Sequence, residues 1–296
     1  MLLMRTLLFV PANRENMVER AQQAAADVIC LDLEDSVPPA EKEAAREIVI
    51  KAIPALKAAG QTVHVRVNHL DSGLTRDDLA AAVCADLDGI AFPKAEGGQH
   101  IRDLDVLIRE QETKKQLKAG LIGLIPSIES AKGVLRCEEI AQASTRLTAI
   151  SLGAYDFTAD LGVARRPDGR ELEYARRVMV HVCAAYGLQS LDTPYGDFRD
   201  EAGLIAETEY VKSIGFKGKY LIHPAQIEPV NRILQPTEDE VEQARKVVAA
   251  FDEALARGHA SVQVDGRMVD TPVAKRARDL IAYAEEISQR EQASQA

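Results

Sequence analysis

Short apolar runs alternate with longer helix-forming segments along most of this 296-residue chain. Several runs, such as Leu121–Ile125, are almost uniformly apolar, which is typical of strands covered on both faces. The segments between the runs place apolar residues three and four positions apart, which predicts amphipathic helices. A repeated strand-helix pattern of this kind predicts a parallel sheet. The eight runs are Arg5–Val10, Val28–Leu33, Thr62–Val67, Asp88–Phe92, Leu121–Ile125, Thr148–Leu152, Gly187–Leu191 and Lys219–Ile222.

Eight parallel strands joined by helices predict a closed (β/α)₈ TIM barrel, whose active site lies where the C-terminal ends of the strands meet. A doubly wound open sheet is the alternative, but it places ligands at one switch point. Here polar residues follow almost every run, so we expect them to form a ring at the barrel mouth. The predicted helices include Glu15–Ala26, Ala40–Ala59, Glu171–Tyr186 and Glu201–Ser213, and the expected ring comprises Asn13, Arg14, Asp32, Glu34, Asp35, Arg66, Asn68, Lys94, Glu129, Asp156, Asp192 and His223.

The last part of the chain predicts a different unit. Residues 1–235 account for the barrel, and residues 236–296 form a C-terminal extension. Thr237 followed by Glu240 predicts the N-terminus of a helix over 237–257. Alternating residues around Asp265 and Gly266 predict a small hairpin within 260–270. A second helix is expected over 272–288, and the polar residues 290–296 are expected to fray.

Charge and cysteine content exclude several classes of protein. The formal net charge of −10 argues against nucleic acid as a partner, although a few local arginines can still bind an anionic small molecule. The four cysteines are far apart and show no metal-binding spacing, so we expect reduced core residues. Since no apolar run approaches the ~18 residues of a membrane helix, no membrane association is expected. These features predict a cytoplasmic enzyme.

Two acidic residues after neighbouring runs form the strongest candidate site. Glu129 follows the fifth run and Asp156 follows the sixth. Because neighbouring barrel strands end side by side, the two carboxylates can converge on one divalent ion. Two carboxylates with no His or Cys nearby suit Mg²⁺, which prefers oxygen ligands and keeps bound water. The alternative is that Glu129 caps the next helix and that Asp156 begins one.

Arg66 needs an acidic partner. With a period of two, His64, Arg66 and Asn68 point to one side of the third strand, and an inward guanidinium is costly unless it meets a carboxylate. The partner is either structural, Asp32 or Glu34, or it is a substrate carboxylate bound by two hydrogen bonds. Spacing alone does not separate these two readings.

Three further residues have both a structural and a functional reading. Asp35 or Ser36 can cap the helix that follows the second run, or Asp35 can join the acids at the barrel mouth. His223 can act as a base, as a satisfied structural donor, or as part of a ligand wall held in place by Pro224. Asp270, taken alone, is an ordinary helix cap.

Nine motifs in the expected order resemble the citrate lyase β-subunit-like (CitE-like) branch of the HpcH/HpaI aldolase superfamily, close to the citramalyl-CoA and malyl-CoA lyases. The resemblance spans nearly the whole chain, which makes it specific for the family and much less specific for the substrate. The motifs are Leu7–Arg14, Leu31–Val37, Val65–Asn68, Phe92–Lys94, Pro126–Gly133, Leu152–Asp156, Asp197–Leu204, Gly218–Pro224 and Met268–Pro272.

The resemblance implies roles for particular residues. Glu129 and Asp156 are implied to bind Mg²⁺, with Mn²⁺ as an alternative, and Arg66 to hold the carboxylate of a 2-oxo acid. The acid at Asp270 is implied to be the catalytic acid/base, carried by a C-terminal segment that reaches over a neighbouring subunit. A homo-oligomer, trimeric or hexameric, is therefore implied. Coenzyme A is implied to lie across the barrel mouth, with substrate contacts from Phe9, Arg14, Arg20, Arg66, Glu129, Ile222 and His223.

One residue departs from the pattern: Tyr155 stands where many relatives have Glu immediately before the metal-binding Asp. The implied reaction is a reversible Claisen cleavage of a 3-hydroxy-3-carboxy acyl-CoA to an acyl-CoA and a 2-oxo acid. Three rivals stay open. They are a citrate lyase β subunit acting on a citryl thioester of an acyl-carrier protein, a malyl-CoA thioesterase, and a non-catalytic protein that retains the barrel.

Overall fold

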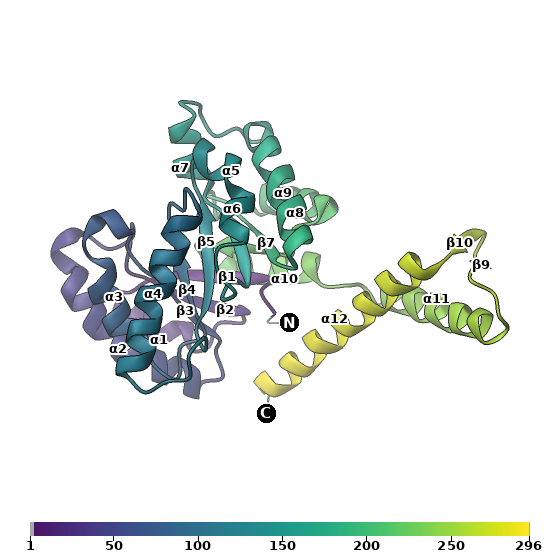
Figure 1. Cartoon of the computed structure of the whole chain (residues 1–296), viewed down its shortest axis with the longest axis horizontal. Helices are drawn as coiled ribbons and strands as arrows, with labels where there is room; N and C mark the ends of the chain where they lie inside the picture. The colour runs from purple at the N-terminus through teal and green to yellow at the C-terminus, as the bar shows by residue number, and fades with distance from the viewer. Residues whose placement is uncertain (1–2, 296) are drawn as a thin grey trace. The chain divides into compact units, whose positions relative to one another are not determined.

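Eight parallel strands pair in sequence order and close into a barrel through β1 and β8. The computed structural model describes residues 3–295, with side chains described for residues 3–292. Helices surround the strands (Figure 1), so the expected (β/α)₈ barrel is confirmed. The strands are β1 (Thr6–Pro11), β2 (Val28–Asp32), β3 (Val63–Arg66), β4 (Gly89–Phe92), β5 (Gly123–Ile128), β6 (Ala149–Leu152), β7 (Gln189–Asp192) and β8 (Gly218–Leu221).

Helices follow the strands as the apolar spacing predicts, and several end earlier or later than expected. The barrel's α-helices are α1 (Glu15–Ala21), α2 (Lys42–Ala58), α3 (Thr75–Ala82), α4 (Gly98–Lys114), α5 (Ala131–Leu135), α6 (Cys137–Ala141), α7 (Ala154–Asp160), α8 (Glu173–Tyr186), α9 (Glu201–Ile214) and α10 (Ile227–Leu234). Short 3₁₀ helices are η1 (Pro39–Glu41), η2 (Leu70–Ser72), η3 (Arg170–Leu172) and η4 (Pro224–Gln226).

Two differences from the expected boundaries have physical causes. Strand β5 runs on to Ile128 because Ser127 and Ile128 pair with β6, which brings Glu129 directly to the strand end. Helix α1 stops at Ala21 rather than Ala26. After it, Asp27 binds both the backbone N–H and the guanidinium of Arg5, an ion pair that fixes the entry to β2.

The barrel interior is a narrow layer of its own, separate from the larger core between strands and helices. In the register of β2 and β3, Cys30 lies beside His64, and Asp32 lies beside Arg66. An apolar cluster fills the interior, whereas the charged side chains of Asp32 and Arg66 meet near the C-terminal ends of the strands. The interior apolar cluster comprises Met4, Leu7, Val28, Cys30, Ala91, Ile125, Ala149, Leu191 and Tyr220, with Phe9 packed against it.

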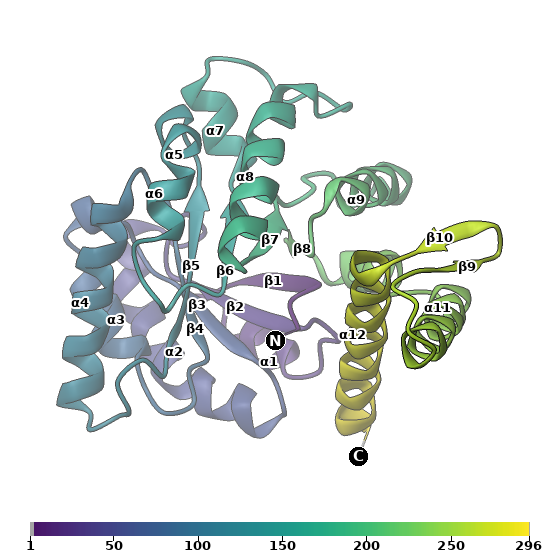
Figure 2. The same ribbon diagram turned by 45° about the vertical axis from the view of Figure 1, so that its right-hand side comes forward.

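The described residues divide into two compact units, one ending at Leu234 and one beginning at Gln235. The second unit contains α11 (Glu238–Ala256), the antiparallel hairpin of β9 (Val262–Val264) and β10 (Arg267–Val269), and α12 (Thr271–Gln295). Figure 2 shows α11 and α12 side by side, with the hairpin between their sequence positions. Thr237 and Glu240 form the expected capping box. Helix α12 runs to Gln295, beyond the predicted helix end at residue 288, and fraying from residue 290 onward stays a prediction.

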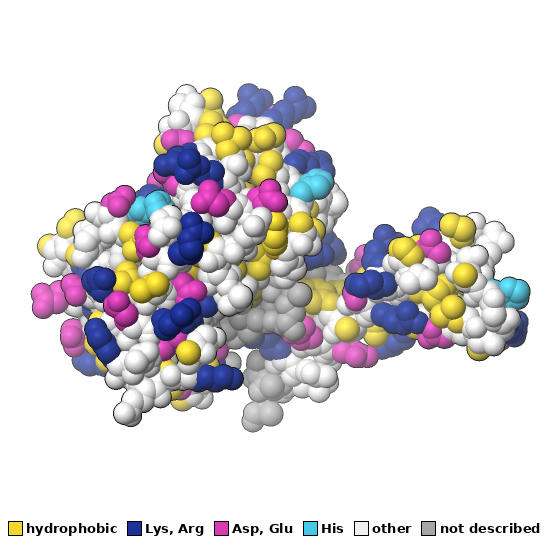
Figure 3. Space-filling model, in the orientation of Figure 1, with side chains coloured by type: hydrophobic (Ala, Val, Ile, Leu, Met, Phe, Trp, Pro, Cys, Tyr) yellow, Lys and Arg dark blue, Asp and Glu magenta, His cyan; other side chains and the backbone are white. Residues whose placement is uncertain are grey.

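The surface carries charges of both signs. On the face seen in Figure 3, Lys and Arg side chains are interspersed with Asp and Glu side chains. All four cysteines are free, and three of them, Cys30, Cys137 and Cys183, are buried, as expected. Among the described residues, no helix combines the length and the apolar character needed to cross a membrane.

His64 gives the fold a testable pH dependence. Burial lowers the pKa of His64 from 6.5 to about 4, and neither of its ring nitrogens has a hydrogen-bond partner among the described residues. The unfolded chain therefore binds a proton between pH 6.5 and 4 that the folded chain does not, so stability falls as the pH falls through this window. The loss is expected to reach about 3 kcal/mol, and it is measured by urea unfolding at several pH values.

His64→Leu should remove most of this slope while leaving neutral-pH stability within about 1.5 kcal/mol, because an apolar group of similar volume replaces an unpaired ring. The matched control is His259→Gln, at an exposed position, which should keep the slope. An unchanged slope in His64→Leu would show that other groups cause the pH dependence.

Candidate functional site

Glu129 and Asp156 line the same cavity, which has a volume of about 160 Å³. Glu129 follows β5 directly, and Asp156 lies in the first turn of α7, which follows the neighbouring strand β6. Glu129 is 6% exposed, whereas the Asp156 side chain is 45% exposed. The structure thus brings together the two acids that the sequence singled out, one buried and one open to solvent.

Glu129 is held as a buried acid without a protein partner in the described part of the chain. Its side chain has room because residue 153 is glycine: a Cβ there would lie 2.4 Å from Glu129 Cγ. Burial, followed by the charges of Asp156 and Glu34, raises the pKa of Glu129 to about 8. A divalent cation would relieve this desolvation and repulsion by pairing with both carboxylates.

The donor set fits a hard cation that keeps several waters. The described residues contain no cluster of three or more His, Cys, Asp or Glu side chains placed to hold a metal. A site with two carboxylates is typical of Mg²⁺, which takes its other ligands from water and substrate. Ser127 and Ser151 lie at paired positions of β5 and β6 and share a hydrogen bond of 2.7 Å, and Ser127 lines the cavity.

Arg66 lines the cavity and is also paired with protein carboxylates. Its Nε and Nη2 donate to the two Asp32 oxygens at 2.7 and 2.6 Å, and its Nη1 lies 3.3 Å from Glu34 Oε2. Of the two readings left open by the sequence, the structure shows the structural partner, Asp32. Burial would raise the pKa of Asp32, but Arg66 outweighs it and holds the pKa below its ordinary value. The guanidinium is thereby oriented and stays at the cavity wall.

Lys94 is the second cation beside these acids, although the sequence analysis predicted for it only a place in the ring. Its Nζ donates to Glu34 Oε1 at 2.7 Å and lies 3.6 Å from Asp35 Oδ1 and 3.9 Å from Asp156 Oδ1. Desolvation would lower the pKa of Lys94, but its hydrogen bond to Glu34 and the surrounding acids raise it. The sequence signal for Lys94 is its position two residues after the fourth strand, at the same end of the barrel as the acids that follow the second strand.

The structure tests the capping alternatives. Ser130, not Glu129, caps α5 by accepting the Gly133 N–H at 3.1 Å. Neither Asp35 nor Ser36 caps the helix after β2, because the residue before η1 is Pro38 and no side chain caps it, so that expectation was wrong. Instead, Asp32 turns this loop by accepting the backbone N–H groups of Glu34 and Ser36 at 2.9 and 3.1 Å.

Asp192 does not join the ring. It is fully buried outside the cavity, where Arg176 Nε and Lys219 Nζ donate to it at 2.9 and 2.6 Å. Burial would raise the pKa of Asp192, but these two cations hold it below its ordinary value. The next residue, Thr193, lines the cavity instead, and its hydroxyl accepts the Ala154 N–H at 3.1 Å. This bond ties β7 to the start of α7, the helix that holds Asp156.

The residues implied to contact coenzyme A lie in different surroundings. Phe9 is in the cavity wall, where its ring stacks on Tyr220 at 4.4 Å and contacts the Arg66 guanidinium at 4.4 Å. The other four do not line the cavity: Arg14 and Arg20 are exposed at α1, and Ile222 is exposed after β8. His223 stacks on Phe198 and accepts the Ala225 N–H at its Nδ1.

Asp270 caps α12, since its Oδ1 accepts the Val273 N–H at 3.2 Å. It belongs to the C-terminal unit, so its implied catalytic role stays a prediction. Tyr155, the departure from the family pattern, is half exposed and lines the cavity beside Asp156.

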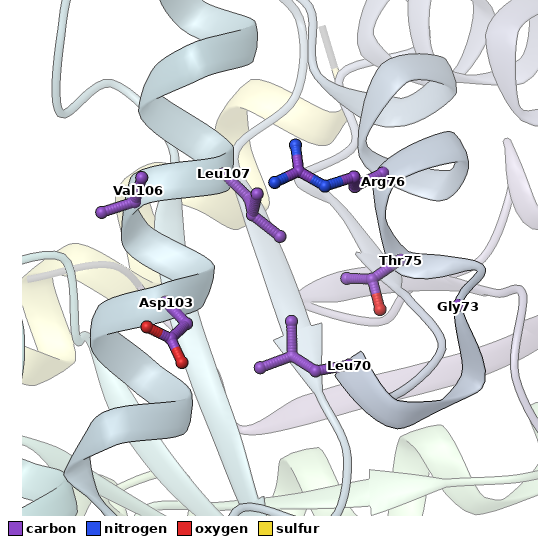
Figure 4. Close-up of a pocket in the computed structure, with 7 residues that line it drawn as sticks. All are labelled: Leu70, Gly73, Thr75, Arg76, Asp103, Val106 and Leu107. Atoms are coloured by element: carbon purple, nitrogen blue, oxygen red, sulfur yellow. The ribbon is translucent and has the colours of Figure 1, made fainter.

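A larger cavity, of about 420 Å³, lies on the outer wall of the barrel between α3 and α4. Figure 4 shows Arg76 and Thr75 on one side, and Asp103, Val106 and Leu107 on the other. Arg76 is paired with Glu110 at 3.0 Å. This groove has no convergent pair of acids, so it does not compete with the cavity at the strand ends as a catalytic site.

The amino-acid sequence that carries these acids and Arg66 is similar to the sequences of known proteins. Residues 5–224 match the model of the HpcH/HpaI aldolase/citrate lyase family. The chain belongs to this family. It is 40% identical to the citrate lyase subunit beta of Leuconostoc mesenteroides subsp. cremoris over 95% of this chain and 93% of that protein. It is 36% identical to an L-malyl-CoA/beta-methylmalyl-CoA lyase of Cereibacter sphaeroides over 96% and 95% of the two chains.

A solved structure shares both the fold and the sequence pattern. CitE from Mycobacterium tuberculosis, in complex with magnesium, acetoacetate and coenzyme A, aligns with a TM-score of 0.76 and 28% identity over 96% of this chain and 98% of that one. The expected family and the expected enzyme class, a carbon–carbon lyase, are confirmed.

The close approach of residue 153 to Glu129 gives a direct test of the site. Gly153→Ala should displace the Glu129 carboxylate, because the new Cβ would lie 2.4 Å from Cγ and 2.8 Å from Cδ. Mg²⁺ affinity, measured by calorimetric titration, is expected to fall by about tenfold or more. In the control Gly97→Ala, the nearest atom lies 3.5 Å away, and affinity should not change. Wild-type affinity in a folded Gly153→Ala protein would contradict this geometry.

Proposed function

We propose that this chain catalyses the reversible, Mg²⁺-dependent Claisen cleavage of a 3-hydroxy-3-carboxy acyl-CoA, of the citramalyl-CoA or malyl-CoA type, to an acyl-CoA and a 2-oxo acid. The observation that supports it best is the shared cavity of Glu129, Asp156 and Arg66. Two carboxylates for one hard cation, with a guanidinium beside them, suit an oxo acid that presents its carboxylate and its oxygen together.

In this proposal Glu129 and Asp156 hold the metal. Mg²⁺, when bound, supplies Lewis-acid polarisation of the substrate oxygen and a template for its adjacent carboxylate. Asp32 and Glu34 orient Arg66, and the guanidinium in turn neutralises and positions the substrate carboxylate. The aromatic ring of Phe9 packs against the same guanidinium and limits its movement.

Asp270 is the proposed acid/base, contributed by a neighbouring copy of the chain. In the cleavage direction its carboxylate accepts the proton of the 3-hydroxyl group, the hydroxyl oxygen becomes the keto oxygen, and the C2–C3 bond breaks. The electron pair of that bond passes to the acyl thioester as an enolate, which takes up a proton at C2, and Asp270 releases the proton that it accepted, so that no net proton is gained or lost. In the condensation direction Asp270 returns the proton to the new hydroxyl group. Coenzyme A would contact Arg14, Arg20, Ile222 and His223 around the barrel mouth. Because these residues do not line the cavity, the contacts would lie outside it.

One observation favours an alternative function, that of a citrate lyase subunit beta. The 40% identity to a citrate lyase subunit beta raises the alternative that the thioester is carried by an acyl-carrier protein. Such a protein would show little activity on free CoA esters. A thioesterase outcome is separated by its products, which are free CoA and the intact hydroxy acid.

The deciding experiment incubates the protein with Mg²⁺, acetyl-CoA or propionyl-CoA and a 2-oxo acid, with mass detection of the condensed thioester. A condensed CoA ester supports the lyase. Absence of any CoA product, together with activity on an acyl-carrier thioester, would favour the second function.

Glu129→Gln should abolish turnover, a loss beyond about a hundredfold, because the neutral amide cannot replace an anionic metal ligand. Its Mg²⁺ affinity should fall in parallel, and calorimetry on the same sample checks this. Because the buried carboxylate is costly without a cation, the apo variant should be at least as stable as the apo wild type. Undiminished turnover would refute the metal role.

Mixing two inactive variants tests whether the site is shared between copies. Asp270→Asn should be inactive alone, and so should Glu129→Gln. If Asp270 acts on a neighbouring barrel, subunit exchange at equal amounts restores about a quarter of wild-type sites, because each restored site needs one intact barrel and one intact C-terminal unit from different chains. Recovery after co-unfolding and refolding is measured as turnover. No recovery in mixed oligomers, verified by mass, would place Asp270 in its own barrel or outside catalysis.

A further inference from the structure

Two histidines from neighbouring βα units meet outside the cavity. His69 comes shortly after β3 and precedes η2, and His100 lies in the first turn of α4, which follows β4. His69 Nε2 lies 3.5 Å from His100 Nδ1, and the two ring planes cross at 67°. Neither histidine lines the cavity of Glu129 and Asp156. The pair is therefore a separate group of nitrogen atoms, which the proposed reaction does not use.

The distance between the two nitrogens is long for a hydrogen bond and suits two ligands of one metal ion. Hydrogen bonds donated by N–H groups usually span about 2.7–3.2 Å. Two imidazole nitrogens that each lie about 2.0–2.1 Å from one tetrahedral ion are about 3.3–3.4 Å apart. The Glu96 N–H also approaches His100 Nδ1 only to 3.5 Å. Hydrogen bonds from the described residues thus satisfy the His100 Nδ1 lone pair only weakly.

A buried aromatic ring supports both imidazoles. Phe92 is fully buried. It stacks on His69 with ring centroids 5.4 Å apart and meets His100 edge-on at 6.5 Å. The His69 side chain is 16% exposed, and His100 is also partly exposed. A dissolved ion can reach the nitrogens while the rings are held, so little ordering is required when the ion binds.

Asp71 is placed to fix the tautomer that metal binding requires of His69. Its Oδ2 lies 3.5 Å from His69 Nδ1, and its backbone N–H lies 3.3 Å from the same nitrogen. When Nε2 binds a metal, the ring proton is on Nδ1, where a carboxylate can accept it. The Asp71 side chain is 91% exposed and can rotate toward the ring. Burial holds the pKa of His69 below its ordinary value, so the neutral ring is available at pH 7.

The charges around the pair allow a cation to bind. Asp71 and Glu96 favour a positive charge there, and Lys94 opposes it. Lys94 Nζ already donates to Glu34 at 2.7 Å, and Lys132 Nζ donates to Glu96 at 2.8 Å. Because these two ion pairs are each close to neutral, the exposed Asp71 carboxylate is the main charge beside the histidines.

We propose that His69 Nε2 and His100 Nδ1 bind one divalent transition-metal ion of the Zn²⁺ class, with water at its other positions. Imidazole nitrogens favour Zn²⁺, Ni²⁺ or Cu²⁺, whereas Mg²⁺ prefers oxygen, so this site and the cavity take different ions. With two ligands from the protein the ion is exchangeable, unlike the ion of a closed structural site. It links the loop after β3 to the start of α4 and therefore stabilises the fold.

The test is calorimetric titration of Zn²⁺ into the full chain, without a histidine tag and with Mg²⁺ in excess. His69→Asn, which keeps a side chain able to cap η2, and His100→Gln should each weaken Zn²⁺ binding by about tenfold or more. The control His181→Gln removes an exposed histidine of α8 and should bind as the wild type does. Thermal unfolding without Zn²⁺ verifies that each variant is folded, and Zn²⁺ should raise the Tm of the wild type and the control.

A variant pair tests the role of Asp71. Asp71→Asn should weaken Zn²⁺ binding by about tenfold, because the amide orients the His69 ring less well. Asp77→Asn removes the same charge at an exposed position of α3 and should have little effect. Equal losses in the two variants would reduce Asp71 to a general electrostatic effect and contradict its role in fixing the tautomer.

X-ray absorption by the Zn²⁺-loaded chain identifies the ligands directly. Two imidazole groups around the ion support the proposal. Oxygen ligands alone would place the ion at Glu129 and Asp156 and overturn it. The proposal also fails if Zn²⁺ does not bind, or if either His69→Asn or His100→Gln binds it with wild-type affinity.

Discussion

Closure of the barrel by the pairing of β1 with β8 is the constraint on which the site depends. Thr6, Leu7 and Leu8 pair with residues 219–221, so the first and last strands complete one continuous parallel ladder with no open edge. All eight strands then end at the same rim. Residues that are distant in sequence consequently line one cavity: Phe9, Arg66, Glu129 and Tyr220. Each of them lies in a strand or directly after one.

The free-energy cost of burying charge explains how the charged side chains at that rim are paired. Arg66 is fixed by two bonds to Asp32, which itself accepts two loop N–H groups, so its guanidinium is positioned before any substrate arrives. Glu129, in contrast, has no such partner in the described chain, and its raised pKa reflects burial beside other acids. The balanced ion pair is a fixed part of the wall, and the unbalanced acid is where a cation gains most.

The proposed mechanism also depends on the C-terminal unit, because this unit contains Asp270. Its small core of Phe251, Val269 and Ala274 joins α11, the hairpin and α12, and the hairpin leads directly to Asp270. A site built from the barrel of one copy and Asp270 of another would couple catalysis to assembly. Asp270, which the sequence alone predicts to be a helix cap, does cap α12 through Oδ1. Because only this one oxygen accepts a hydrogen bond from the described residues, the cap does not oppose the catalytic proposal.

The sequence by itself determined the barrel and the candidate acids, because strand-length apolar runs and helical spacing are local patterns and because each acid directly follows a run. It did not determine the partner of Arg66, the burial of Asp192 or the role of Lys94. Asp192 follows a run just as the site acids do, yet only packing placed Arg176 and Lys219 against it outside the cavity. Spacing along a strand fixes which residues reach the rim, whereas the direction and charge balance of each side chain depend on neighbours from other strands and helices. The Phe9 and Tyr220 stack, built from the two ends of the barrel sequence, is likewise a product of closure that no local pattern contains.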